Sequence, residues 1–219
     1  AQGAGGAAAC IWNGNLDVIN CLFNNNHADS VGGAIHCDGL LTINGSILND
    51  NHASQKGGAI NLHSEGSTNQ ITFCNFDNDS SAANGGALNL EGNQPININQ
   101  CNFTNCSNAG ARGGGICGNN VSVFLNNSNF MNCVAAGSGG GFFGEDVELS
   151  GINCVFDGCS AANYGGGMEW ETTFGGMKAA GAPGDFNISL YHFKDDTAGI
   201  SGGGLDIFGG GTSTITNST

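Results

Sequence analysis

The ten cysteines of this chain are its side chains with the widest chemical scope, as metal ligands, nucleophiles or disulfide partners. None of them stands in a Cys-x-x-Cys pair, which argues against a zinc site. Their even number is typical of a protein from an oxidising compartment, and it favours secretion. Several cysteines recur at intervals of 26 or 27 residues, so their positions follow a larger pattern: Cys10 and Cys37, Cys74 and Cys101, and Cys106, Cys133 and Cys159.

Carboxylates and histidines show no catalytic arrangement. Glycoside hydrolysis needs two carboxylates at a defined separation, and the one carboxylate pair beside an aromatic strand is Asp195-Asp196, where similar segments carry "NN", "DN" or "ND" as bend residues. A lyase acting on acidic sugars would need a base and cationic side chains, but Lys and Arg together number four. The histidines are scattered, although His27 and His52 share the contexts "NNHA" and "DNHA" and are interpreted as a surface or bend pair. We therefore expect no enzyme activity, no catalytic residue and no cofactor, with a polysaccharide-degrading enzyme as the least favoured alternative.

Two acidic clusters leave a calcium role open. One is "EDVE", with Glu145, Asp146 and Glu148, and the other is "EWE", with Glu169 and Glu171. Calcium prefers carboxylate oxygens, but neither cluster follows the spacing of a known calcium loop.

The charge balance limits the classes of partner. Eighteen acidic residues against four basic ones give a net charge of −14, which argues against nucleic acid or an anionic membrane surface. The hydrophobic content of 39% is too high for a disordered chain, and no apolar stretch has the length of a membrane span. The chain begins with Ala and shows no signal peptide, so it is interpreted as a mature product or as an excerpt of a longer solenoid.

A repeated motif sets the positions of all these residues. "GGAIH" at 32–36 returns as "GGAIN" and "GGALN", and later as "GGGIC", "GGGFF", "GGGME" and "GGGLD". A large apolar residue precedes each glycine pair by nine residues, or by ten in the case of Phe103. The first glycines are Gly32, Gly57, Gly85, Gly113, Gly139, Gly165 and Gly202, and the preceding apolar residues are Phe23, Leu48, Phe76, Phe103, Phe130, Phe156 and Phe193. A period of 25 to 28 residues, broken by one interval of 37, indicates a repeat architecture.

The content of each unit predicts strands rather than helices. The glycine load would cost about 1 kcal/mol at each interior helix position, whereas "LLTINGSI", "PININ" and "FNISL" alternate apolar and polar residues. Each unit divides into an alternating strand, a "CxF" strand and a "GGxΦxΦ" strand, where Φ is apolar. The sequence therefore predicts an all-β, right-handed parallel β-helix of about eight three-strand coils, spanning 1–219 as one domain. The glycines are expected at one bend, and Asn26, Asn51, Asp79 and Asp196 at a second bend with left-handed backbone.

The paired motifs resemble the repeats of the polymorphic outer membrane protein family. The matching stretches include "FNNNHADSVGGAI", "FDNDSSAANGGAL" and "FKDDTAGISGGGL", and the resemblance covers almost the whole chain. It implies a right-handed parallel β-helix that is secreted or displayed at the cell surface. The chain departs from the family in lacking a C-terminal β-barrel domain and in its many cysteines and glycosylation sequons.

The repeat phase makes disulfides between coils a prediction. Equivalent residues of adjacent coils have Cα atoms about 4.8 Å apart, inside the range that a disulfide accepts. Bonds Cys10–Cys37, Cys74–Cys101 and Cys106–Cys133 are allowed, with the connectivity open and small buried thiols as the alternative. The candidate cysteines are Cys10, Cys37, Cys74, Cys101, Cys106, Cys133, Cys154 and Cys159.

Surface features add two further expectations. The Asn-x-Ser/Thr sequons make eight asparagines candidates for N-glycans: Asn44, Asn78, Asn102, Asn105, Asn120, Asn126, Asn187 and Asn217. The 37-residue interval holds about ten extra residues, which predict an inserted loop around 170–184. Trp170 at its start falls in an inward position of the repeat.

These patterns favour a structural role outside the cell. Ile215 stands in the phase of Ile43 and Ile71, so the chain ends within a coil, and neither end carries the polar capping coil that solenoids need. Open coil ends leave unpaired strand edges. We therefore expect a non-catalytic structural subunit of an extracellular fibre or cell-surface assembly, whose ends meet neighbouring β-helix segments or other copies stacked end to end. The alternative is an adhesin-like surface binding module, which would be a capped monomer with ligand-binding loops.

Overall fold

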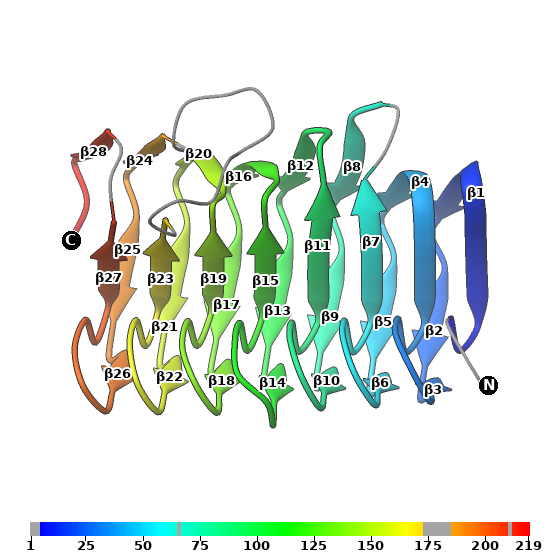
Figure 1. Ribbon diagram of the computed structural model, residues 1–219, viewed down its shortest axis with the longest axis horizontal. Helices are drawn as coiled ribbons and strands as arrows, with labels where there is room; N and C mark the ends of the chain where they lie inside the picture. Colours follow the sequence, from blue (N-terminus) through cyan, green and yellow to red (C-terminus); the bar gives the residue numbers. More distant parts are fainter. Residues whose placement is uncertain (1–4, 65–66, 173–184, 210–211) are drawn as a thin grey trace.

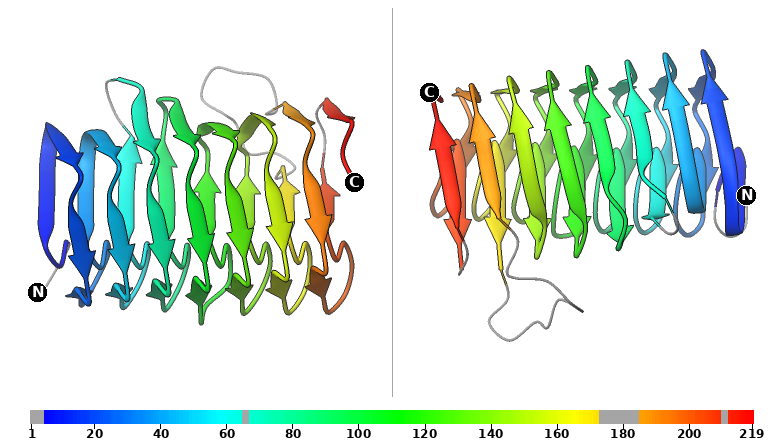
Figure 2. Two further views of the ribbon diagram at one scale, coloured as in Figure 1. Left: turned by 180° about the vertical axis from the view of Figure 1, so that it is seen from behind. Right: turned by 90° about the horizontal axis from the view of Figure 1, so that it is seen from above.

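The computed structural model describes residues 5–64, 67–172, 185–209 and 212–219. These residues form strands and bends and contain no helix, so none with the length and apolar character of a membrane-spanning segment. The coils stack along one axis into a parallel β-helix of about seven turns, against the expected eight (Figure 1). Both further views show the same regular stacking from end to end (Figure 2).

The strands form three parallel sheets, each running along the axis of the helix. The first sheet has fourteen strands on two faces, which β1 (Ala8–Ile19) and β4 (Ile35–Asn44) join by running through both. One of these faces holds the strands that follow the glycine motif: β7 (Ile60–Ser64), β11 (Leu88–Gly92), β15 (Ile116–Asn119), β19 (Phe142–Glu145), β23 (Met168–Glu171) and β27 (Leu205–Phe208). The other holds the alternating strands: β8 (Asn69–Thr72), β12 (Ile96–Asn99), β16 (Ser122–Asn126), β20 (Glu148–Ile152), β24 (Phe186–Ser189) and β28 (Ser213–Thr216).

The two other sheets have seven strands each. The second sheet is built from the "CxF" segments: β2 (Leu22–Asn24), β5 (Ile47–Asn49), β9 (Asn75–Asp77), β13 (Asn102–Thr104), β17 (Asn129–Met131), β21 (Val155–Asp157) and β25 (His192–Lys194). The third was not predicted, and its strands have two residues each: β3 (His27–Ala28), β6 (His52–Ala53), β10 (Ser80–Ser81), β14 (Ser107–Asn108), β18 (Val134–Ala135), β22 (Ser160–Ala161) and β26 (Thr197–Ala198). A strand of two residues is too short to show a period-2 pattern, so this sheet leaves no signal in the sequence.

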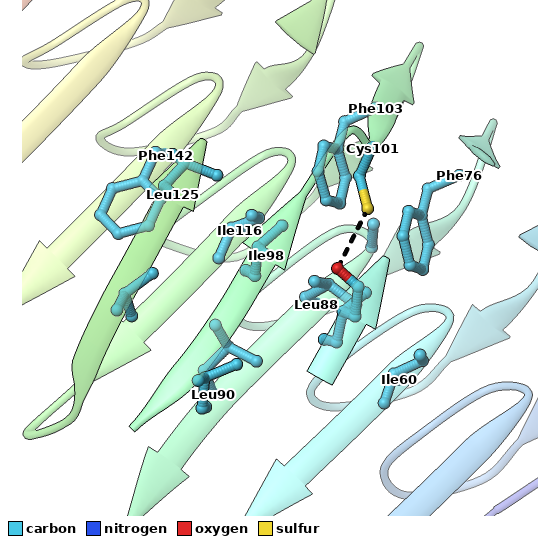
Figure 3. Packing of buried hydrophobic residues seen from close by; sticks show 14 of the residues in the cluster. Ile60, Phe76, Leu88, Leu90, Ile98, Cys101, Phe103, Ile116, Leu125 and Phe142 are labelled. Atoms are coloured by element: carbon cyan, nitrogen blue, oxygen red, sulfur yellow. Dashed lines mark hydrogen bonds between the residues drawn. The ribbon is translucent and has the colours of Figure 1, made fainter. Parts of the chain in front are cut away.

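The core consists of columns of identical or similar side chains. The rings of Phe76, Phe103, Phe130 and Phe156 stack nearly parallel, with centroids 4.7, 4.7 and 4.5 Å apart. Aliphatic columns fill the space beside them, as Figure 3 shows for Ile60, Leu88 and Ile116. The aromatic positions that precede the glycine pairs therefore form a continuous stack from Phe76 onward, whereas Phe23 lies in register with Leu48.

The glycine pairs are explained by two different constraints at one bend. The first glycine has left-handed backbone, as at Gly85 with φ 65°. This conformation is unfavourable for a residue that carries a Cβ. The second lies against the next coil, so a Cβ on Gly86 would overlap the carbonyl oxygen of Gly114. Substitution at either position therefore disturbs the backbone.

The second bend differs from the expectation by one residue. Left-handed backbone occurs at Asp50 (φ 55°) and Asn78 (φ 56°), and not at the following Asn51 and Asp79. The following residues are fully buried and face inward, where Asn51 Nδ2 donates to Asp79 Oδ1 at 2.9 Å. The prediction for Asn26, Asn51, Asp79 and Asp196 was wrong because Asn and Asp fill both positions, and composition does not separate them.

Candidate functional site

The cysteine columns lie inside the β-helix. Cys106, Cys133 and Cys159 are fully buried, and their side chains contact one another in coil order. The column continues into Asp196, whose Oδ1 accepts the backbone N–H of Cys159 at 2.7 Å. Cys37 lies in register with Cys10, and Cys74 contacts Cys101. The repeat phase therefore predicted these neighbours correctly.

The neighbouring cysteines form no disulfide in the described structure. All ten lie in the described part of the chain, and none is paired there. In-register residues of parallel strands are related by translation, so their Cβ atoms are about 4.8 Å apart, beyond the 3.5–4.5 Å that a disulfide requires. A disulfide would therefore need the backbone to shift, and the bonds stay a prediction for the candidate cysteines: Cys10, Cys37, Cys74, Cys101, Cys106, Cys133, Cys154 and Cys159. Cys154 in addition has no cysteine beside it, because its column continues into Tyr191.

Most of these thiols are held in their protonated form. Burial raises the pKa of Cys37 and of Cys117 to about 12, and that of Cys154 to about 11. The hydrogen bond from Cys101 instead lowers the pKa of Cys74. The thiolate, and not the thiol, is the nucleophile and the metal ligand. The cysteines with a raised pKa stay protonated and therefore act as packing residues in their columns.

The eight sequon asparagines all lie at the surface of the β-helix. Asn78, Asn102, Asn105, Asn120 and Asn217 are exposed, and Asn44, Asn126 and Asn187 are partly exposed. Asn102 faces outward in a ladder in which its Nδ2 donates to Asn75 at 2.8 Å and its Oδ1 accepts from Asn129 at 2.9 Å. Glycosylation of these sites stays a prediction.

The acidic and histidine candidates do not converge. Asp195 is exposed and pairs with Lys194 at 3.5 Å, whereas Asp196 is partly buried and turns inward, so this pair shares no cleft. Burial raises the pKa of Asp196 to about 7. The predicted pair of His27 and His52 stacks with ring centroids 5.1 Å apart at the surface. Across the described residues, no group of three or more His, Cys, Asp and Glu side chains is arranged to hold a metal ion.

The two end coils present the interior of the β-helix to solvent. Ile215 is in register with the buried Ile188 and is 46% exposed, and Ile207 is in register with the buried Trp170 and is 37% exposed. Phe193, the last ring of the aromatic column, is only partly buried. At the opposite end, Ala8, Cys10, Leu16 and Phe23 are partly buried members of columns that are fully buried one coil further in.

The surface also carries the start of the inserted loop and one cavity. Trp170 is buried, as predicted, and donates its Nε1–H to the Val147 carbonyl at 2.8 Å; residues 173–184 of the loop lie outside the described residues. The sequence did not predict a cavity of about 410 Å³ on the outer face of β23 and β27, whose lining includes Tyr164 and Glu169. The signal that could have found it is the stacking of outward positions along the glycine-motif strands.

Comparison of the chain with models of protein families, with curated protein sequences and with solved structures finds no match in any of the three. The resemblance to polymorphic outer membrane protein repeats therefore rests on the quoted motifs, and the parallel β-helix rests on the structure.

Proposed function

We propose that this chain is a non-catalytic structural β-helix of an extracellular or cell-surface assembly, in which further β-helix coils cover its end coils. The observation that carries the proposal is the in-register stacking of like side chains from coil to coil, which makes the face of one coil fit the next. Leu205, Ile207 and Ile215 continue columns that are fully buried in the preceding coils. Exposed apolar surface beside an unpaired strand edge favours association with another strand.

The internal ladders support the same role. Neighbouring coils are joined by parallel strand pairing, by apolar contacts and, from Phe76 to Phe193, by stacked rings, so one coil is the surface that fits the next. Contact between the two different ends of copies is heterologous, and such contacts extend into a filament. The eight surface sequons and the net charge of −14 fit an exposed, soluble outer face.

The test is the association state of the 219-residue chain, in which the only further coil available is that of a second copy. We expect concentration-dependent stacking, seen by sedimentation and as rods of constant width by electron microscopy. The double substitution Ile207→Lys and Ile215→Lys places two cations on one end face and is expected to leave monomers.

The matched control is Phe124→Lys, which introduces a cation at an exposed aromatic residue on the side of the helix, in β16. This variant is expected to stack like the unchanged chain. A chain that stays monomeric at millimolar concentration would overturn the proposal.

A further inference from the structure

The outer face of the glycine-motif strands carries three columns of side chains. The first column precedes the glycines and contains Lys56, Asn84, Arg112, Ser138, Tyr164 and Ser201. The second contains His36, Asn61, Asn89, Cys117, Phe143, Glu169 and Asp206. The third contains Asp38, His63, Glu91, Asn119, Glu145, Glu171 and Phe208. The columns run side by side, so a cation in the first column lies near the acids of the third.

Two cations of the chain show how this face holds a positive charge. Lys56 Nζ lies 2.6 Å from Glu91 Oε1. Arg112 pairs with Glu145 and, at 3.2 Å, with Glu171, and its guanidinium carbon lies 4.6 Å from the centroid of the Phe143 ring. A guanidinium flanked by two carboxylates and stacked on an aromatic ring is a favourable arrangement, because it combines charge-assisted hydrogen bonds with a cation–π contact.

The cavity of about 410 Å³ gathers a similar set of acids and aromatic rings, of which Glu171 is already paired with Arg112 and Glu169 and Asp206 are not. Its lining includes the carboxylates of Glu169, Glu171 and Asp206 and the rings of Tyr164 and Phe208. The first column offers Tyr164 and Ser201 at this point of the face, where earlier coils have Lys56 and Arg112. Figure 1 shows the strands that form the cavity, β23 and β27, as neighbours near the C-terminal end.

Glu169 is the unusual residue of this cavity. Its side chain is 4% exposed, and its Oε2 has no hydrogen-bond partner within the described structure. Neither Glu169 nor Asp206 forms an ion pair with the described residues, and Asp206 accepts a hydrogen bond from the Ser201 hydroxyl at 2.7 Å. A buried carboxylate oxygen without a partner is costly, and a cation in the cavity would supply the missing contact. Burial raises the pKa of Glu169, against the opposing effect of a hydrogen bond from Ser138, and the nearby carboxylates of Glu171 and Asp206 raise it further.

We propose that the cavity lined by Tyr164, Glu169, Glu171, Asp206 and Phe208 binds a guanidinium group supplied from outside the chain. The acids would accept hydrogen bonds from the guanidinium N–H groups, and the rings would flank its plane, as Phe143 does for Arg112. The guanidinium could come from a free small molecule or from an arginine side chain of a partner protein, and the same chemistry recognises both. This binding does not depend on end-to-end stacking.

Binding is measured by isothermal titration calorimetry at pH 7.5 in 20 mM NaCl, with the unchanged chain. The non-stacking double variant Ile207→Lys and Ile215→Lys is not used for this measurement, because Ile207 also lines the cavity. The probes are methylguanidine and a capped tripeptide with a central arginine, together with matched tripeptides that carry lysine or citrulline. We expect the arginine peptide to bind at least tenfold more tightly than the citrulline peptide, which has the same shape without the charge. Methylguanidine binding as tightly as the arginine peptide identifies a free small cation as the ligand, and a clear preference for the peptide identifies a partner chain.

Two variants locate the site. Glu169→Gln and Asp206→Asn are each expected to weaken binding of the arginine peptide by about tenfold or more, whereas the control Glu148→Gln, at an exposed acid of β20, is expected to change it by less than twofold. Asp206 is partly exposed, so its variant keeps the test valid if the change at buried Glu169 impairs folding. Equal binding of the arginine and citrulline peptides, or unchanged affinity in both cavity variants, would overturn the proposal.

Discussion

At the residue scale, burial decides what the reactive groups of this chain can do. The thiols of Cys37 and Cys117 have raised pKa values because they are buried, so these two cysteines contribute mainly packing. The buried carboxylates are different, since each leaves an oxygen without a partner. Asp79 Oδ2 and Glu169 Oε2 are both in this state within the described structure. The first lies in the closed interior and the second lines a cavity, so only the second can be reached by a ligand.

Asp79 gives a test of this interpretation. Burial raises the pKa of Asp79 well above 3.8, so the folded state binds its proton more tightly than the unfolded state does. The stability contributed by this group is therefore complete below about pH 4 and is lost as the pH rises through the folded pKa. Asp79→Asn keeps the acceptor oxygen used by Asn51 and is expected to raise the free energy of unfolding by about 1–3 kcal/mol at pH 8, with a much smaller gain at pH 3.

Urea denaturation at the two pH values measures this difference. The control is Asp77→Asn, which removes the same charge from an exposed position two residues earlier and is expected to change the stability by less than about 0.5 kcal/mol. A variant at Asp79 that is less stable than the unchanged chain at pH 8 would contradict the argument.

At the scale of the strand and bend, the sequence predicts the features that recur in every coil and does not predict the features that lack a repeated motif. The glycine pair and the aromatic position were predictable because coils that stack in register have the same backbone conformation and the same space at equivalent positions. The same residue type therefore recurs there. The two-residue strands were not predictable, and the left-handed residue was misplaced by one because pairs such as Asp50-Asn51 are chemically alike. The cavity at Glu169 was not predicted because its lining side chains come from successive coils. Inspection of one repeat at a time does not show that these side chains are neighbours.

The bend before the "CxF" strands offers a stability test. Phe73 has φ 55° and Leu190 has φ 55°, while Asn and Gly occupy most other positions of this bend. Left-handed backbone costs a non-glycine residue roughly 1–2 kcal/mol, and the Phe73 side chain is 53% exposed, so it packs little. Phe73→Gly is therefore expected to raise the free energy of unfolding by about 1 kcal/mol.

The matched control is Phe124→Gly, at an exposed phenylalanine inside strand β16, where glycine is expected to cost about 0.5–1 kcal/mol. Opposite signs for the two variants in urea denaturation support the strain at Phe73. Equal losses would show that the Phe73 ring contributes more than its backbone costs.

At the scale of the whole molecule, the β-helix is a one-dimensional stack. Each interior coil is covered by two neighbours, and its core residues, such as Leu88 and Ile116, are fully buried. An end coil has one neighbour, and Ile207 and Ile215 of the last coil are exposed. In such an array the stability of a coil depends on its nearest neighbours, so opening starts at the ends and proceeds inward.

Hydrogen exchange should therefore report the position of each coil along the axis. In dilute solution we expect the amides of β27 and β28 to exchange at least tenfold faster than those of β11 and β15, because an end coil can open without disturbing two interfaces.

The proposed stacking adds a second expectation for hydrogen exchange. When the chain is concentrated, β27 and β28 gain a neighbour and should become protected, while exchange in β11 and β15 stays unchanged. The double variant Ile207→Lys and Ile215→Lys should lose this concentration dependence and keep the gradient. Uniform exchange along the axis would contradict the nearest-neighbour argument, whereas a gradient that is the same at every concentration would contradict stacking alone.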